Sequence, residues 1–190
     1  MKSIRLVMVR DHMDHLPSFS CPDGYRIRTF ARDRGDERRW AEIELAAGEF
    51  PDQQQALQRF DEDFGQSLGD LEDRCFILED ARGDAIGTAT AWYGRVAGEE
   101  RGRVHWVGIV PDHQGRGLAK PLLSTVMARL AKHHQKAYLS TRTTNYRAVN
   151  LYLACGFVPY LMDGSSEEGW SMMEHVLHRT FLYRSPRTVS

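Results

Sequence analysis

The 190-residue sequence contains little cysteine, and the cysteines that it has are widely separated. They are Cys21, Cys75 and Cys155, and no two of them form a Cys-x-x-Cys pair. An odd number at such spacings argues against a disulfide framework and against a zinc–cysteine site. We therefore expect reduced, mostly buried thiols and no bound metal.

Long apolar segments are also missing. No stretch approaches the roughly 20 apolar residues that cross a bilayer, and the first 16 residues hold only a short apolar patch that Arg5 interrupts. Such a start lacks the apolar core of a secretory signal. The sequence therefore predicts no membrane partner and a cytoplasmic location.

The sequence has no excess of charge of either sign. Its 25 Lys and Arg residues balance 26 Asp and Glu residues, for a net charge of -1. Because nucleic-acid affinity rests mainly on cationic contacts with phosphates, we expect no nucleic-acid partner. Repeats and Pro/Gly/Ser linkers are absent too, so a single domain over residues 1–190 is predicted.

The elements that are present indicate an α/β (α+β) fold, with a mixed sheet covered by helices. Hydrophobic periodicity predicts strands at 4–10, 25–30, 75–80, 85–94, 101–110, 137–141 and 157–162, and helices at 37–50, 51–64 and 146–155. A further helix carries Leu118, Leu122, Val126 and Leu130 at steps of four. Near the end, Ser166 is a possible N-cap of a helix, and residues 179–184 could form a strand.

A glycine-spaced turn lies between the strand at 101–110 and the helix that carries Leu118. Its glycines are Gly115 and Gly117. Such a turn presents unpaired backbone N–H groups at the positive end of a helix dipole, where an anion binds. Arg116 or Lys120 could add charge. Pro121 is unexpected in the helix, because its missing N–H leaves one early carbonyl unpaired.

Two motifs carry a family resemblance. Residues 114–119, Gln-Gly-Arg-Gly-Leu-Ala, match [Q/R]-x-x-G-x-[G/A], and residues 145–157 match N-x-x-A-x-x-L-Y-x-x-x-G-F. The first string resembles the coenzyme A pyrophosphate loop of the GNAT superfamily of acyl-CoA-dependent N-acyltransferases, and the second resembles a later segment of the same superfamily. The resemblance covers residues 85 to about 162, whereas residues 1–73 match only in the order of their elements.

The resemblance implies a GNAT-type sheet, mixed and mostly antiparallel, flanked by helices. It implies transfer of an acetyl group from acetyl-CoA to an amine, with acetyl-CoA as cosubstrate and without a metal. Backbone amides of Ile109 or Val110 would hold the thioester carbonyl oxygen. The cofactor-binding residues implied are Ile109, Val110, Gln114, Gly115, Arg116, Gly117, Leu118, Ala119, Asn145 and Asn150.

Two residues are candidates for proton transfer. Tyr152 takes the superfamily position of the acid that protonates the departing thiolate, although its ring could instead only pack under the cofactor. His105 lies where some related enzymes carry a base for the amine proton, although a strand histidine is often structural. Asn145 could either contact the cofactor or cap the following helix.

The acceptor is expected to be a primary amine of a small molecule or an amino-acid-like compound. Glu44, Glu49, Glu62 and Asp63 could hold its ammonium group. Two alternatives remain open: an idle acyl-CoA-binding module used in sensing or assembly, and an acetyltransferase that acts on a protein amine. A homodimer is expected from the superfamily alone.

Overall fold

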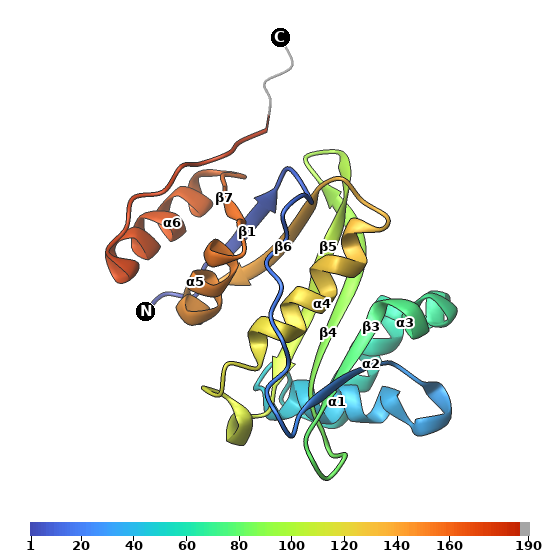
Figure 1. Ribbon diagram of the computed structural model, residues 1–190. Helices are drawn as coiled ribbons and strands as arrows, with labels where there is room; N and C mark the ends of the chain where they lie inside the picture. The colour runs from blue at the N-terminus through green and yellow to red at the C-terminus, as the bar shows by residue number, and fades with distance from the viewer. Residues whose placement is uncertain (187–190) are drawn as a thin grey trace. The chain divides into compact units, whose positions relative to one another are not determined.

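The computed structural model describes residues 1–186, which form six α-helices, four short 3-10 helices and seven strands (Figure 1). The strands are β1 (Arg5–Arg10), β2 (Arg26–Thr29), β3 (Cys75–Glu79), β4 (Ala85–Val96), β5 (Glu99–Ile109), β6 (Ala137–Arg142) and β7 (Val158–Tyr160). The helices are α1 (Asp36–Ala46), α2 (Gln53–Phe64), α3 (Leu68–Arg74), α4 (Ala119–Ala131), α5 (Tyr146–Ala154) and α6 (Gly164–Leu177). All the predicted strands up to residue 162 are therefore present, with shifted ends, and α3 was not predicted.

The strands form one sheet in the order β2-β3-β4-β5-β6-β1-β7. β1 lies between β6 and β7 and is antiparallel to both, with Val7 opposite Ser140 and Tyr160. β3 is antiparallel to β2 and to β4. The predicted mixed, mostly antiparallel sheet flanked by helices is confirmed.

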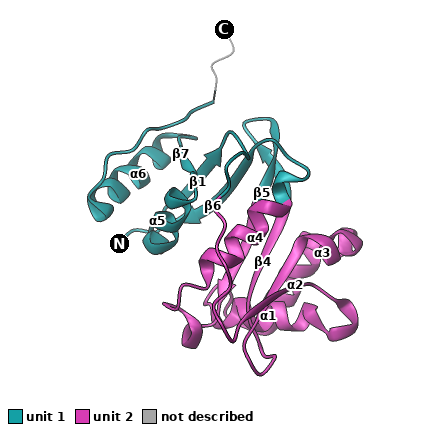
Figure 2. Ribbon diagram, viewed as in Figure 1, with its two compact units in different colours: residues 1–16, 93–103, 130–190 teal, residues 17–92, 104–129 magenta. Residues whose placement is uncertain are grey.

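Contacts divide the chain into two compact units (Figure 2). Unit 1 comprises residues 1–16, 93–103 and 130–190, and unit 2 comprises residues 17–92 and 104–129. The single domain over residues 1–190 stays a prediction, and each unit is described by itself.

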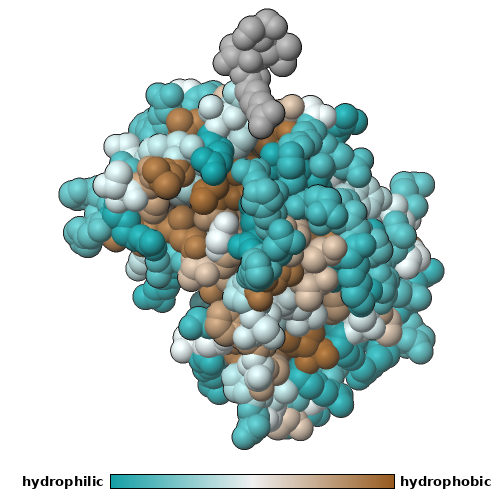
Figure 3. Space-filling model, turned by 45° about the horizontal axis from the view of Figure 1, so that its top comes forward, coloured by the Kyte–Doolittle hydropathy of each residue, from teal (hydrophilic) through white to brown (hydrophobic). Residues whose placement is uncertain are grey.

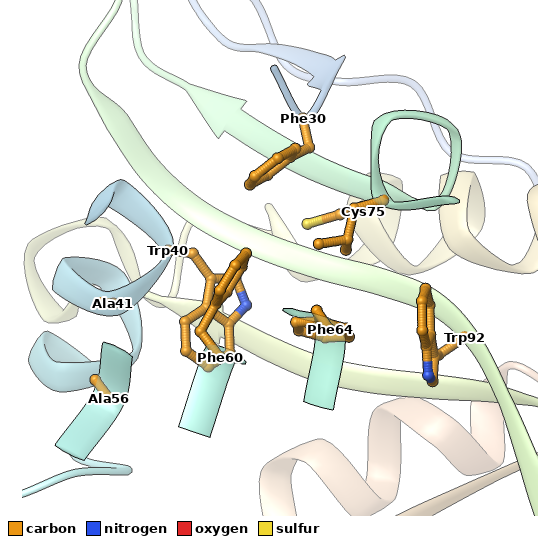
Figure 4. Packing of buried hydrophobic residues seen from close by; sticks show 9 residues of the cluster. Phe30, Trp40, Ala41, Ala56, Phe60, Phe64, Cys75 and Trp92 are labelled. Carbon is orange, nitrogen blue, oxygen red and sulfur yellow. The ribbon is translucent and has the colours of Figure 1, made fainter. Parts of the chain in front are cut away.

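Unit 2 has a core rich in aromatic side chains, where α1 and α2 pack together. Figure 4 shows Trp40 and Phe60 close together, with Phe64 between them and Trp92. The ring of Trp40 lies 5.3 Å from that of Phe60, and Phe60 stacks on Phe30 at 5.9 Å. Burying an aromatic side chain of this size contributes about 2–3 kcal/mol, so this cluster fixes where α1 and α2 present their polar residues.

Two helices of unit 2 have other ends than predicted: α1 ends at Ala46 instead of residue 50, and α2 begins at Gln53 instead of residue 51. Asp52 caps α2 by accepting the Gln55 N–H at 2.8 Å, so Pro51 precedes the helix instead of occupying its first position. Leu118, Leu122, Val126 and Leu130 are all buried, as their spacing predicts.

The sequence predicted that Pro121 would leave one early carbonyl of the helix unpaired, and this prediction was wrong. α4 begins at Ala119, so Pro121 falls in the first turn, where an N–H has no helical partner in any case. The Gly117 carbonyl accepts the Lys120 N–H at 3.3 Å.

In unit 1, α6 lies near β1, and α5 lies near α6 and β6 (Figure 1). Gly156, with φ 79°, follows the end of α5, as predicted. Two predictions were wrong. The N-cap of α6 is Asp163, whose carboxylate accepts the Ser166 N–H at 2.9 Å. Ser166 lies one turn inside the helix, and its hydroxyl oxygen accepts the backbone N–H of Asp163. Residues 179–184 form only an isolated bridge between Arg184 and Tyr160, so no strand follows α6 there.

The surface drawn in Figure 3 is largely hydrophilic, with smaller hydrophobic areas between. Leu182 is the most exposed of the large apolar side chains of residues 1–186, at 82%. Over the same residues, no helix combines the length and the apolar character needed to cross a membrane. Cys75 and Cys155 are buried and Cys21 is partly exposed.

Candidate functional site

The backbone of β5 is irregular at Trp106, which has φ 46° in the left-handed region. In a regular strand, consecutive side chains point to opposite faces. Here, however, His105 Nε2 and Trp106 Nε1 both reach Oδ2 of Asp63, at 3.0 and 2.7 Å. The left-handed residue is a strained, bulge-like feature, and it explains how two neighbours in one strand share one partner.

Asp63 is ionised at neutral pH. Burial raises the pKa of its carboxyl, but the hydrogen bonds from His105 and Trp106 outweigh this and hold the pKa at about 2. Arg59 adds an ion pair with Oδ1 at 3.1 Å. An ionised carboxylate only accepts hydrogen bonds, so Nε2 of His105 carries a proton, and a neutral His105 keeps its lone pair on Nδ1. This contact fixes the orientation of the His105 ring.

Glu44 on α1 is the second acidic group beside β5. It is 1% exposed, and neither carboxyl oxygen has a hydrogen-bond partner within residues 1–186. Burial, and then repulsion from Glu49, raises its pKa to about 8. A Cβ added at Gly108 would lie 2.7 Å from Glu44 Oε1, so the carboxyl packs against β5 one residue before Ile109. By contrast, Glu49 and Glu62 are exposed.

The end of β5 leads into the glycine-spaced loop. Val110 donates its N–H to the Ile86 carbonyl at 2.9 Å, so of the two predicted backbone donors this one is already used in the sheet. Gln114 Nε2 donates to the Ile109 carbonyl at 2.7 Å and thereby ties the loop to the strand end. Of the predicted pair, Ile109 therefore remains the candidate for the carbonyl oxygen.

The loop itself has the open backbone that an anion site needs. Gly115 and Gly117 have φ 76° and 78°, and an added Cβ at either would meet nothing within 4 Å. Leu118 is buried below them and Ala119 begins α4. A helix N-terminus preceded by exposed, left-handed glycines suits a diphosphate. The residues present thus fit the phosphates of coenzyme A.

Arg116, which the sequence offered as a source of charge, is held within unit 2. Nη1 donates to the Tyr25 hydroxyl at 3.0 Å and Nη2 to the Asp112 carbonyl at 2.9 Å. The Tyr25 ring in turn meets the His113 ring edge to face, at 5.9 Å. These contacts place its positive charge beside the loop.

The remaining predicted residues lie in unit 1, on or next to α5. Tyr152 is buried, at 8% exposure, with its ring centroid 6.3 Å from that of Phe157. Asn145 and Asn150 are exposed. Asn145 occupies the N-cap position of α5, but among the described residues its side chain makes no capping hydrogen bond. Its contact with the cofactor stays a prediction.

Sequence reasoning missed the pairing of His105 with Asp63, although it named both residues. They are 42 positions apart, and only a helix packed against a strand brings them together. No local pattern marks the left-handed backbone at Trp106. Within residues 1–186, no group of three or more His, Cys, Asp or Glu side chains is arranged to hold a metal ion.

Comparison with known proteins adds three findings. A family model described as "Acetyltransferase (GNAT) family" matches residues 31–157. The chain is 31% identical over 144 residues to mycothiol acetyltransferase of Streptomyces griseus, a match that covers 75% of this chain and 46% of that protein. It is 28% identical over 111 residues to spermidine N(1)-acetyltransferase of Vibrio cholerae, which covers 57% of this chain and 63% of that protein.

Among solved structures, a GCN5-related N-acetyltransferase from Sphaerobacter thermophilus has a similar fold, with a TM-score of 0.66 and 22% identity. The match covers 83% of this chain and 48% of that chain. This chain spans about half the length of the mycothiol acetyltransferases that it matches.

Proposed function

We propose an activity for this chain, which belongs to the acetyltransferase (GNAT) family. It transfers an acetyl group from acetyl-CoA to a primary amine of a small-molecule acceptor by direct attack. The loop at residues 114–119 carries the proposal, since its two left-handed glycines leave open space before α4. The names of the relatives, mycothiol and spermidine acetyltransferases, support a small acceptor over a protein amine.

The chain's own residues divide the work of binding. Backbone amides from Gln114 to Ala119 would hold the diphosphate, with the α4 dipole favouring its charge. The amide of Ile109 would donate to the thioester carbonyl oxygen, where negative charge develops. Asn145 and Asn150 would contact the remainder of the cosubstrate. Acetyl-CoA supplies the activated acetyl group.

Two residues would move protons while the amine nitrogen bonds to the acetyl carbon and the bond to sulfur breaks. His105 would take the amine proton at Nδ1, directly or through water, because Asp63 holds Nε2 and stabilises the imidazolium that forms. Tyr152 would give its phenol proton to the departing thiolate. Its ordinary pKa, about 10, lies near enough to that of a thiol, about 8.5, for this transfer to succeed.

A panel of primary amines tests the proposal. Release of free CoA would be measured with each amine, and acetyl-CoA binding would be measured by calorimetry in parallel. We expect binding, and turnover with at least one small amine. Binding without turnover would favour the idle acyl-CoA-binding module, and turnover with lysine peptides alone would favour a protein acceptor.

The role of Tyr152 is tested by removing only its hydroxyl. Tyr152→Phe keeps the ring, so acetyl-CoA affinity should stay within a few fold while kcat falls by about 100-fold, the usual scale for general acid catalysis. Pre-steady-state measurement would establish that chemistry limits turnover. If the ring only packs, Phe should leave kcat unchanged and only Tyr152→Ala should damage the enzyme.

A further inference from the structure

Glu44 is a buried acid that lacks hydrogen-bond partners. Both of its carboxyl oxygens lack hydrogen-bond partners within residues 1–186, and the side chain is 1% exposed. Leaving a buried polar group unpaired costs about 1–3 kcal/mol, and more for a charge. No proton relay described above uses this group. Such a cost is typical of a site that a ligand completes.

A second polar atom on α1 is in the same condition. Trp40 lies one helical turn before Glu44, and its indole N–H also has no partner among the described residues. Residues four apart in a helix share a face, so a hydrogen-bond donor and a pair of acceptors stand unpaired on one face of α1. Two orphaned polar groups so close in the helix indicate a polar ligand rather than an isolated packing defect.

The position of the carboxyl relates it to the reaction. Glu44 Oε1 occupies the space where a side chain at Gly108 would be, and Gly108 immediately precedes Ile109. Glycine is therefore required at 108 if the carboxyl is to reach the strand. The acid lies beside the backbone that is expected to hold the thioester carbonyl.

The missing partner must donate hydrogen bonds to two oxygens and compensate a negative charge. A protonated primary amine does both, because it brings three N–H donors and a full positive charge. A hydroxyl brings a single donor and no charge. Within residues 1–186 no three-residue metal cluster competes for the carboxyl.

We propose that Glu44 binds the reactive amino group of the acceptor, beside Ile109, and so makes the site selective for cationic primary amines; this inference rests on the proposed function. Because so little of Glu44 is exposed, the amine must displace the side chains around it on entry. The ammonium then stabilises the carboxylate form, so Glu44 loses its proton when the amine binds. Before attack the ammonium gives one proton back to the Glu44 carboxylate and becomes a neutral amine, and His105 takes the second proton when that amine attacks.

Calorimetry with the full chain saturated with CoA tests the inference without turnover. The probes are benzylamine, ethanolamine and spermidine, with benzyl alcohol as the neutral analogue, at pH 7 in two buffers of different ionisation enthalpy. The variants are Glu44→Gln and Glu42→Gln. Glu42 is a matched control, because it lies on the same helix but is exposed and pairs with Arg38 at 2.9 Å.

For the wild type we expect at least one amine to bind with release of close to one proton, and benzyl alcohol to bind at least 10-fold more weakly. Glu44→Gln should bind that amine at least 10-fold more weakly and release no proton, while Glu42→Gln stays within threefold of the wild type. Glutamine resembles the neutral acid, so the variant should fold. The proton count on the wild type needs no variant at all.

Equal amine affinity in the wild type and Glu44→Gln, or amine binding no tighter than that of benzyl alcohol, would overturn the inference. Failure of the proposed function is recognised separately. In that case acetyl-CoA fails to bind, or amines bind with proton release but no free CoA appears from acetyl-CoA.

Discussion

Unit 2 contains two regions with buried carboxyl groups, and they are built in opposite ways. In the first, Arg28 donates to Asp36 Oδ1 at 2.9 Å and to Glu79 Oε1 at 2.6 Å, and both acids are 0% exposed. Although burial raises their pKa values, these hydrogen bonds lower both below the usual range. In the second, Glu44 is equally buried, it has no ion-pair or hydrogen-bond partner within residues 1–186, and its pKa rises to about 8.

The difference shows that burial alone does not decide what an acid does. The protein itself supplies cationic partners for Asp36 and Glu79, since Arg28, Arg34 and Arg39 all lie within 4.0 Å of one or both of them. They connect β2, β3 and α1 and hold that part of the unit together. Glu44 lies on the same helix as Asp36 but has no hydrogen-bond partner in the described part of the chain. A group that binds a ligand must keep its hydrogen-bonding atoms available in this way.

The largest effect is expected from removing the shared cation. Arg28→Met keeps the length of the side chain but leaves two buried carboxylates short of their main partner, so the free energy of unfolding should fall by roughly 3–5 kcal/mol at pH 7. Urea denaturation measures this. The deficit should shrink at acid pH, because Asp36 and Glu79 have lowered pKa values and lose their stabilising charge only as the pH falls through them.

Arg38→Met is the matched control. Its partner Glu42 is exposed, so the loss should stay within about 0.5 kcal/mol. An equal loss in both arginine variants would show that the buried network has no special role.

The next effect has the opposite dependence on pH. Glu44 has a folded pKa of about 8, above the ordinary value of 4.5, so the folded chain holds an extra proton between these limits and wild-type stability falls as the pH rises through them. Glu44→Gln removes this pH dependence. Between pH 5 and pH 8 the free energy of unfolding of the wild type should therefore fall by roughly 3 kcal/mol relative to that of the variant, at about 1.4 kcal/mol per pKa unit.

The neighbouring titratable groups do not obscure this measurement. Glu49 is exposed, and burial raises the pKa of the Cys75 thiol to about 11, outside the window. Parallel stability curves for the wild type and Glu44→Gln would mean that Glu44 has a cationic or hydrogen-bonding partner after all.

A smaller effect should come from Asp63, the acid that pairs with His105. Asp63→Asn keeps the shape of the side chain but removes the charge beside His105, so kcat/KM should fall by about 10- to 100-fold. The acid limb of its pH profile should move to lower pH, because the imidazolium loses its carboxylate. Glu62→Gln, which alters an exposed neighbour on α2, should leave both unchanged. A profile that falls without moving would make Asp63 structural.

Local patterns predicted the parts of this molecule that local physics determines. The step of four from Leu118 to Leu130 marks the buried face of α4, and the glycines at 115 and 117 mark a loop with left-handed, open backbone, because both depend on backbone geometry within one turn. The same holds for Gly156 after α5.

Features that depend on distant pairing were not predictable. Nothing in the strand at residues 5–10 indicates that it lies between β6 and β7, more than 120 positions away. The left-handed backbone at Trp106 persists because Asp63 and the rings of Trp40 and Phe50 surround that residue, and these contacts exist only in the folded chain. For the same reason the sequence named Glu44 and Asp63 together but could not tell the unpaired acid from the paired one.

The claim that unit 2 holds acetyl-CoA through the backbone of its glycine loop is tested most directly by calorimetric titration of acetyl-CoA into three proteins: the wild type, Gly117→Asn and Gly117→Asp. Asparagine tolerates the left-handed backbone and adds bulk without charge, whereas aspartate adds a negative charge against the diphosphate. The account predicts binding to the wild type, weaker binding to Gly117→Asn and no measurable binding to Gly117→Asp. Nearly unchanged affinity in a folded Gly117→Asp protein would contradict it.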